Sequence, residues 1–140
     1  MAIKILIIGL SGSGKTTLAN SLLYLLANAQ YLNADIVRSQ FNDWDFSIAG
    51  RLRQANRMAF LSENNNNKYI IYDFICPLDS FRDIIQPDLI IWMNTTKSSI
   101  YKDTDAIFAP LNINTKYKNI IITNFDYDIT SIYNSIINYE

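Results

Sequence analysis

Short apolar runs alternate along this chain with segments whose apolar residues recur at helical spacing. The predicted strands are Ile3–Ile8, a short strand that ends near residues 31–33, residues 69–75, Leu89–Met93 and residues 119–123. The predicted helices are residues 15–28, residues 47–63 with Ser47 as N-cap, a short piece after Pro77, and residues 129–139. The pattern predicts an α/β fold, a five-stranded and mainly parallel sheet in a three-layer α/β/α arrangement.

The strands, except the second, are largely apolar, which is typical of strands covered by helices on both faces. Residues 64–67, four asparagines, predict a polar turn. Residues 95–118 have no clean periodicity, and we expect either a mobile lid or a plain connection there. With no repeat and no linker, the 140 residues predict one domain, residues 1–140.

Residues 9–16 fit G-x-x-x-x-G-K-[ST], the phosphate-binding loop (P-loop) of nucleoside-triphosphate enzymes. The loop lies between a predicted strand and a predicted helix, which is the context that the motif requires. Its backbone N–H groups form a nest for anions, Lys15 supplies a charge for the β- and γ-phosphates, and the Thr16 hydroxyl can ligate Mg²⁺. The expected ATP-phosphate contacts are Gly9, Ser11, Gly12, Ser13, Gly14, Lys15, Thr16 and Thr17.

Composition narrows the chemistry that the chain can perform. The single cysteine, Cys76, excludes an intrachain disulfide and a cysteine-rich zinc site. With no histidine in the chain, proton transfer must use carboxylates, lysine or tyrosine. A net charge of −1 argues against long nucleic acids and acidic membranes as partners. The apolar N-terminal run is too short to span a membrane and leads straight into the P-loop, so we expect a cytoplasmic protein.

Asp35 and Arg38 follow the end of the second predicted strand, the edge at which ligands bind in open α/β sheets. Three residues apart, they share one face of a helical turn. Asp35 can accept a hydroxyl proton or hold Mg²⁺ through water, while Arg38 can grip an anionic substrate. The alternative is a surface ion pair at the start of a helix.

Residues 41–57 combine aromatic side chains with clustered arginines. An aromatic ring followed by Arg51, Arg53 and Arg57 suits a flat base plus phosphate or sulfate. Trp44 and Phe46 fit this function or a place in the core, and the core interpretation is the stronger for Trp44.

Two further segments carry candidate chemistry. Asp73 ends a buried strand, where P-loop proteins place a carboxylate near the Mg²⁺ shell; a turn cap is the alternative. Cys76 is expected to be a half-buried small residue, and Arg82 either an anion contact or a solvated helix residue. Lid candidates are Tyr101, Lys102 and Phe108.

Four ordered segments together resemble the adenylylsulfate kinase (APS kinase) family. Residues 9–19 are similar to its version of the P-loop, and residues 32–38 resemble L-D-G-D-x-[VL]-R. Residues 45–47 with Arg51 resemble G-F-S-x-x-x-R, and residues 74–77 with Arg82 resemble F-I-S-P-x-x-x-x-R. The order and spacing of these segments agree with the family pattern over residues 3–82, which is more than half of the chain.

This family transfers the γ-phosphate of ATP to the 3′-hydroxyl of adenosine 5′-phosphosulfate (APS) in sulfate assimilation. The resemblance implies the P-loop NTPase fold, ATP and Mg²⁺ as cofactors, a small nucleotide as partner and, since the family is often dimeric, a homodimer. Lys15 and Asp35 would be catalytic, with Asp35 as base or hydroxyl-orienting group, and Thr16 and Asp73 would lie at the metal. The implied substrate contacts are Asp35, Arg38, Phe46, Arg51, Ile75, Arg82 and Lys102.

The chain also departs from the family pattern. Asn33 and Ala34 replace the first Asp and the Gly of L-D-G-D, Gln54 replaces an Asn, and Asp73 replaces a small residue. The family's R-D-x-K-G-L-Y-x-K-A and F-T-G segments are nearly absent; residues 100–105 echo them faintly. Two alternatives therefore accompany the lead hypothesis: a P-loop kinase for another nucleotide, a nucleic-acid 5′-end or a sugar, and a non-catalytic nucleotide-binding module.

Overall fold

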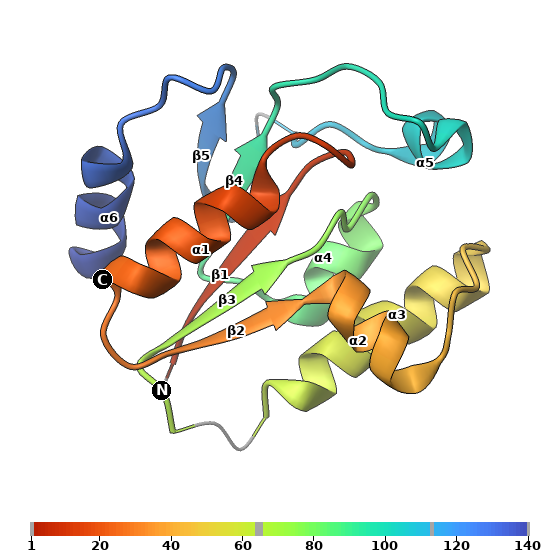
Figure 1. The fold of residues 1–140 in the computed structure, drawn as a ribbon, viewed down its shortest axis with the longest axis horizontal. Helices are drawn as coiled ribbons and strands as arrows, with labels where there is room; N and C mark the ends of the chain where they lie inside the picture. Colours follow the sequence, from red (N-terminus) through yellow and green to blue (C-terminus); the bar gives the residue numbers. More distant parts are fainter. Residues whose placement is uncertain (1, 64–65, 113, 140) are drawn as a thin grey trace.

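The computed structural model describes residues 2–63, 66–112 and 114–139, so residues 64 and 65 of the predicted polar turn lie outside it. Its sheet has five parallel strands in the order β2-β3-β1-β4-β5 (Figure 1). The strands are β1 (Ile3–Ile8), β2 (Ala29–Asn33), β3 (Tyr69–Asp73), β4 (Leu89–Met93) and β5 (Lys118–Ile122). The helices are α1 (Lys15–Leu25), α2 (Ala34–Phe41), α3 (Ile48–Leu61), α4 (Asp79–Ile85), α5 (Lys102–Ile107) and α6 (Ile129–Ile137). The predicted fold class is confirmed.

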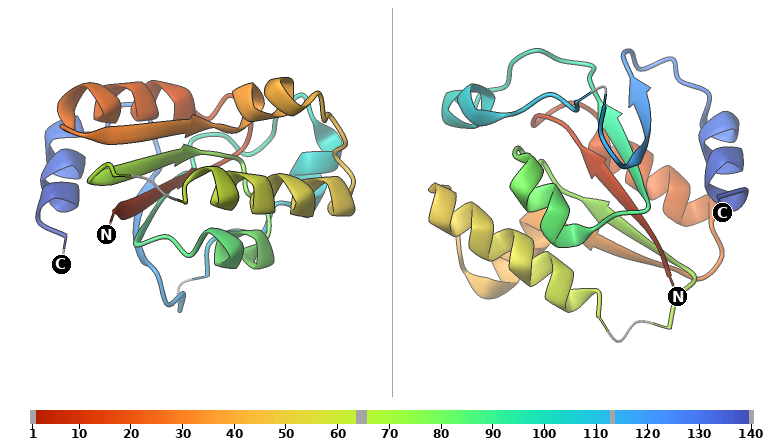
Figure 2. Two further views of the ribbon diagram at one scale, coloured as in Figure 1. Left: turned by 90° about the horizontal axis from the view of Figure 1, so that it is seen from below. Right: turned by 180° about the vertical axis from the view of Figure 1, so that it is seen from behind.

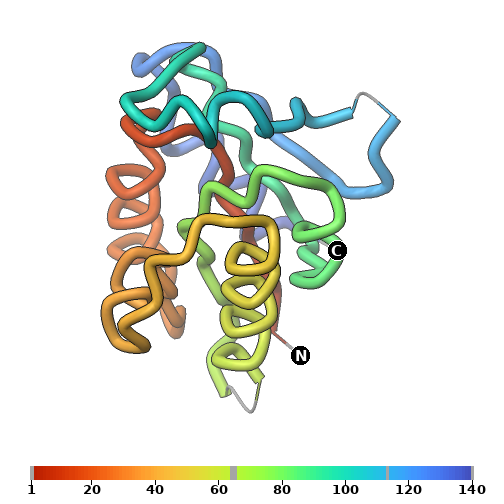
Figure 3. Tube along the Cα trace, turned by 90° about the vertical axis from the view of Figure 1, so that its right-hand side faces the viewer, coloured from red at the N-terminus to blue at the C-terminus, as the bar shows by residue number. Residues whose placement is uncertain are grey.

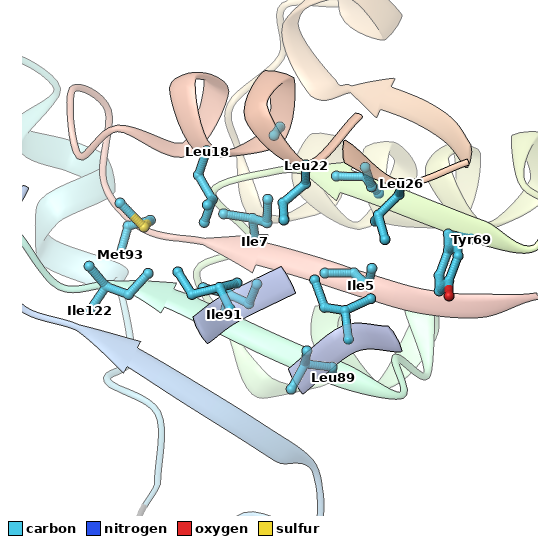
Figure 4. Close-up of a cluster of buried hydrophobic side chains, with 14 residues drawn as sticks. Ile5, Ile7, Leu18, Leu22, Leu26, Tyr69, Leu89, Ile91, Met93 and Ile122 are labelled. Atoms are coloured by element: carbon cyan, nitrogen blue, oxygen red, sulfur yellow. The ribbon is translucent and has the colours of Figure 1, made fainter. Parts of the chain in front are cut away.

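Helices cover the sheet on both faces, as Figure 2 shows for α1 and α4. Because side chains alternate along a strand, β1 sends Ile5 and Ile7 to one face and Leu6 and Ile8 to the other. The first face packs on α1 and α6, and Figure 4 shows the leucines of α1 above Ile5 and Ile7. The second face packs on α3 and α4 through Met58, Phe81 and Ile85. Two apolar layers thus fix β1 and the loop that leaves it.

The prediction that every strand but the second is covered on both faces is wrong for β5. This strand lies at the edge of the sheet, and Ile121 is 48% exposed. Its isoleucines gave it the apolar pattern of a covered strand, but Ile120 and Ile122 pack in the layer of α1 and α6, while Ile121 points to the opposite face.

Side-chain caps fix the starts of α2 and α3, and the sequence reveals one of the two. Ser47 caps α3 as predicted, with its hydroxyl accepting from the Gly50 N–H at 3.1 Å. Asn33 caps α2 by accepting from the Ile36 N–H at 3.0 Å. The sequence did not predict the full length of α2, because eight residues carry too short a periodic signal.

All strands run in one direction, so their carboxyl ends meet at one edge of the sheet. Figure 3 shows the segment after β4, with α5, at the same end of the molecule as the loop after β1. The Thr95 hydroxyl donates to the carbonyl of Ser13 at 2.7 Å and joins this segment to the P-loop. Residues 95–118 therefore contain a helix, α5, near the expected site.

Replacing Leu22 by Ala tests the layer between α1 and the sheet. Leu22 is fully buried, so the change should lower the free energy of unfolding by about 2–5 kcal/mol. Tyr24 lies on the same helix and is 90% exposed, so Tyr24→Ala should change it by under about 0.5 kcal/mol. Urea unfolding measures both, and equal losses would contradict the placement of α1.

Candidate functional site

The P-loop takes a shape that particular glycines make possible. A Cβ on Gly9 would lie 2.7 Å from Ser13 Oγ and 2.8 Å from the Met93 carbonyl oxygen, so no larger residue fits without a shift. Gly14 has a φ of 98° at the N-cap of α1, a conformation that L side chains rarely adopt. The loop then enters α1 at Lys15, so the first N–H groups of the helix face the cleft that a phosphate would occupy.

Lys15 lies folded over the loop and is almost completely buried. Its Nζ donates to the carbonyl of Leu10 at 3.0 Å. Burial lowers the pKa of Lys15, while the negative charges of Asp73 and Asp35 act in the opposite direction. The ammonium group therefore lies within the field of both carboxylates, one at the end of β3 and the other in the first turn of α2.

Asp73, at the end of β3, is buried and receives several hydrogen bonds. The Thr16 hydroxyl donates to its Oδ2 at 2.7 Å, and so does the Tyr31 hydroxyl at 2.7 Å. The Asn33 side-chain amide donates to the same oxygen at 3.0 Å. Within the described residues no three or more Asp, Glu, Cys or His side chains cluster as metal ligands. Mg²⁺ commonly uses one or two protein oxygens plus substrate phosphates and water, so the Thr16–Asp73 pair fits that ion.

The opposite half of the cleft is built around Phe46 and two buried arginines. Arg38 donates to the carbonyls of Asp43 at 3.0 Å and Asp45 at 3.2 Å, and its guanidinium lies 4.4 Å from the Phe46 ring centroid. Burial lowers the pKa of Arg38. Arg51 approaches the same ring at 5.4 Å. Both guanidiniums therefore shape the loop that holds Phe46, as well as lining the cleft.

Arg51 also connects α3 with α5. Its Nε donates to the Phe46 carbonyl at 2.8 Å, and its Nη2 donates to the Thr104 hydroxyl at 2.8 Å. Asp103 lies 3.5 Å from Nη2. The segment after β4 thus reaches the cleft through α5, although the family's longer lid motifs are nearly absent.

These groups line one cleft of about 730 Å³. The predicted residues that line it are Ser11, Gly12, Gly14, Lys15, Thr16, Thr17, Asp35, Arg38, Phe46, Arg51, Asp73 and Ile75. Gly9 and Ser13 are predicted contacts that do not line it; both are buried, and Ser13 lies beneath the loop against Gly9. Lys102 is exposed and also absent from the lining, whereas its neighbours Tyr101 and Asp103 contribute to it.

The structure does not place Arg82 at the cleft. Its side chain is 1% exposed and donates to the carbonyls of Cys76 at 3.0 Å and Ala109 at 2.7 Å. A pair with Asp79 at 3.0 Å completes its bonding. Arg82 is therefore neither an anion contact nor a solvated residue here, because the loops after β3 and β4 use its donors. Cys76 is fully buried beside it, and burial raises the pKa of its thiol.

The sequence missed several residues of the cleft. Trp44 is 50% exposed and lines the cleft, so the stronger expectation, that it belongs to the core, is wrong. Phe125 approaches Gly14 from the loop after β5 and also lines the cleft. Its position after a strand end was the one available signal. Tyr31 gave no signal, since a tyrosine in a strand is ordinary.

The strand order, the P-loop after β1 and the acidic end of β3 define a P-loop kinase. The model of the family described as adenylylsulphate kinase matches residues 1–106, and the chain belongs to that family. No curated protein sequence matches the chain. No helix in the described residues is long and apolar enough to cross a membrane.

Solved structures of kinases share the fold along nearly the whole chain. The APS kinase of Mycobacterium tuberculosis, solved with AMPPNP and APS, aligns with a TM-score of 0.68 and 18% identity, over 99% of this chain and 96% of that one. A sugar kinase from Janibacter sp. aligns with a TM-score of 0.70 and 14% identity, over 99% of this chain and 94% of that one. Shikimate kinase from Acinetobacter baumannii aligns with a TM-score of 0.60 and 15% identity, over 98% of this chain and 92% of that one.

Arg82→Ala tests the structural placement of this arginine. The buried carbonyl of Cys76 and the partly buried carbonyl of Ala109 would lose their donor, so the free energy of unfolding should fall by about 2–4 kcal/mol. Arg53→Ala is the control, because Arg53 makes its ion pairs at the surface and should cost under about 1 kcal/mol. Urea unfolding compares them, and a loss for Arg82→Ala no greater than the control's would refute the placement.

Proposed function

We propose that this chain transfers the γ-phosphate of ATP to the 3′-hydroxyl of adenosine 5′-phosphosulfate. The observation that carries the proposal is one cleft with the P-loop at one end and Asp35, Arg38 and Arg51 at the other. Phosphoryl transfer depends mainly on positioning and charge neutralisation, and a cleft of this construction supplies both. The proposal takes residues 1–140 as a single kinase domain, with residues 95–118 as its lid.

In the donor half, the N–H groups of residues 11–17 would bind the phosphates of ATP. Lys15 would exchange its bond to the Leu10 carbonyl for the β- and γ-phosphates, because an anion is a stronger partner than a neutral carbonyl. Thr16 and Asp73 would hold Mg²⁺, directly and through water. When bound, Mg²⁺ neutralises the charge that develops on the transferring phosphoryl group.

In the acceptor half, Asp35 would orient the attacking hydroxyl and accept its proton. Its carboxylate is exposed to the cleft at the first turn of α2, and its charge acts on Lys15. Proton and phosphoryl group would therefore move between groups at one end of the sheet. Arg38 and Arg51 would face the phosphosulfate, and Phe46 and Ile75 would contact the nucleoside.

The family match supports APS as acceptor, and the solved relative with AMPPNP and APS shows that this fold accommodates both molecules. A kinase with another acceptor is the second candidate. It is favoured by Asp73, which departs from the family pattern, and by the near absence of the family's lid motifs from residues 95–118. A sugar kinase and shikimate kinase share this fold.

The deciding experiment measures ADP release from Mg-ATP with and without APS. Release that depends on APS, with the 3′-phosphorylated product identified by mass spectrometry, would support the proposal. Tight ATP binding without APS-dependent release would refute APS as acceptor. A panel of other nucleotides, sugars and 5′-hydroxyl oligonucleotides would then separate another acceptor from a non-catalytic binding module.

Asp35→Asn should leave ATP affinity unchanged and lower kcat by about 10²–10⁴-fold, because the amide cannot accept the hydroxyl proton. Lys15→Ala should instead weaken ATP binding, since it removes the charge that faces the phosphates. Isothermal titration with AMPPNP and steady-state kinetics distinguish the two effects. A normal kcat in Asp35→Asn would remove this residue from the role of base.

A further inference from the structure

The carboxylate of Asp73 has three hydrogen-bond donors on one oxygen. Thr16, Tyr31 and Asn33 all donate to Oδ2, at 2.7, 2.7 and 3.0 Å. The Asn33 amide also donates to the Tyr31 hydroxyl at 3.1 Å, so Tyr31, Asn33 and Asp73 form a closed triangle. Thr16 belongs to the P-loop helix, whereas the other two donors come from β2. The strand pair thus presents Asp73 to the loop in one fixed orientation.

Strand pairing brings the members of this triangle together. In the register of β2 with β3, Asn33 lies opposite Asp73, and Tyr31 lies opposite Ile71. Residues 31 and 33 point to the same face because side chains alternate along a strand. The Tyr31 side chain therefore extends along that face toward Asp73 and contacts the same carboxylate as Asn33.

The Asn33 side chain has no freedom to reverse its amide. Its Oδ1 accepts the Ile36 N–H as the N-cap of α2, at 3.0 Å. With the oxygen used by the cap, the NH₂ group must face Asp73, where a donor is required. An aspartate at residue 33 would keep the cap but would set two carboxylates side by side.

We propose that Tyr31 and Asn33 are positioning residues that hold the Asp73 carboxylate against Thr16. The inference rests on the proposed function, since it assumes Mg-nucleotide binding at the P-loop. Thr16 and Asp73 supply only oxygen atoms, as Mg²⁺ prefers.

The first experiment compares Tyr31→Phe with Tyr72→Phe. Tyr72 is a matched control, because its buried hydroxyl also donates one bond of 2.7 Å, but to Ser62 on the other face of the sheet. AMPPNP affinity is measured by titration calorimetry in Mg²⁺ and in EDTA. Tyr31→Phe should lower the ratio of the two affinities by about tenfold and leave the EDTA affinity unchanged. Tyr72→Phe should leave the ratio at its wild-type value.

Equal ratios in the two variants would overturn the role of Tyr31. A wild-type protein that binds no AMPPNP in either buffer would instead overturn the proposed function itself. Thermal unfolding of both variants provides the stability control. A drop in the ratio confined to Tyr31→Phe, at similar melting temperatures, supports positioning of the carboxylate, because general destabilisation would lower both affinities.

The second experiment removes the carboxylate that Tyr31 and Asn33 hold. Asp73→Asn should lose most of the Mg²⁺ dependence of AMPPNP binding, because an amide is a poorer partner for Mg²⁺ than a carboxylate. An Asp73→Asn variant with the wild-type ratio of affinities in Mg²⁺ and in EDTA would refute the placement of Asp73 at the metal, and with it the positioning roles of Tyr31 and Asn33.

Discussion

The parallel pairing of β1 with β3 and β4 is the constraint on which the rest of the structure depends. A parallel strand cannot return through a tight turn, so each connection must cross back over a face of the sheet. These crossings supply the helices that bury β1 from both sides. They also bring every strand end, with its polar residues, to one edge. The cleft therefore follows from strand direction before any particular side chain is considered.

Arginines contribute to this site mainly by organising backbone. Arg38, Arg51 and Arg82 are all buried, and each donates to at least one main-chain carbonyl of a loop. The planar guanidinium suits this task, because its donors reach several acceptors at fixed angles. Arg38 and Arg51 still border the cleft, whereas Arg82 does not.

The sequence predicted those parts of the fold that depend on local pattern. The P-loop, the extent of β1 and β4 and the Ser47 cap each have a signal within a few residues, and the structure confirms them. Features that depend on distant partners were missed. The burial of Arg82 requires the carbonyl of Ala109, and the hydrogen bond of Tyr31 requires strand register. The catalytic and binding roles of the cleft residues, and the homodimer, stay predictions.

Asn33 performs two tasks with one planar group. Its oxygen fixes the first turn of α2, on which Asp35 lies, and its nitrogen fixes the carboxylate of Asp73. Because the amide is rigid, rotation about its side-chain torsions displaces both contacts at once. The geometry of the acceptor side and that of the phosphate side are thus mechanically linked through a single side chain.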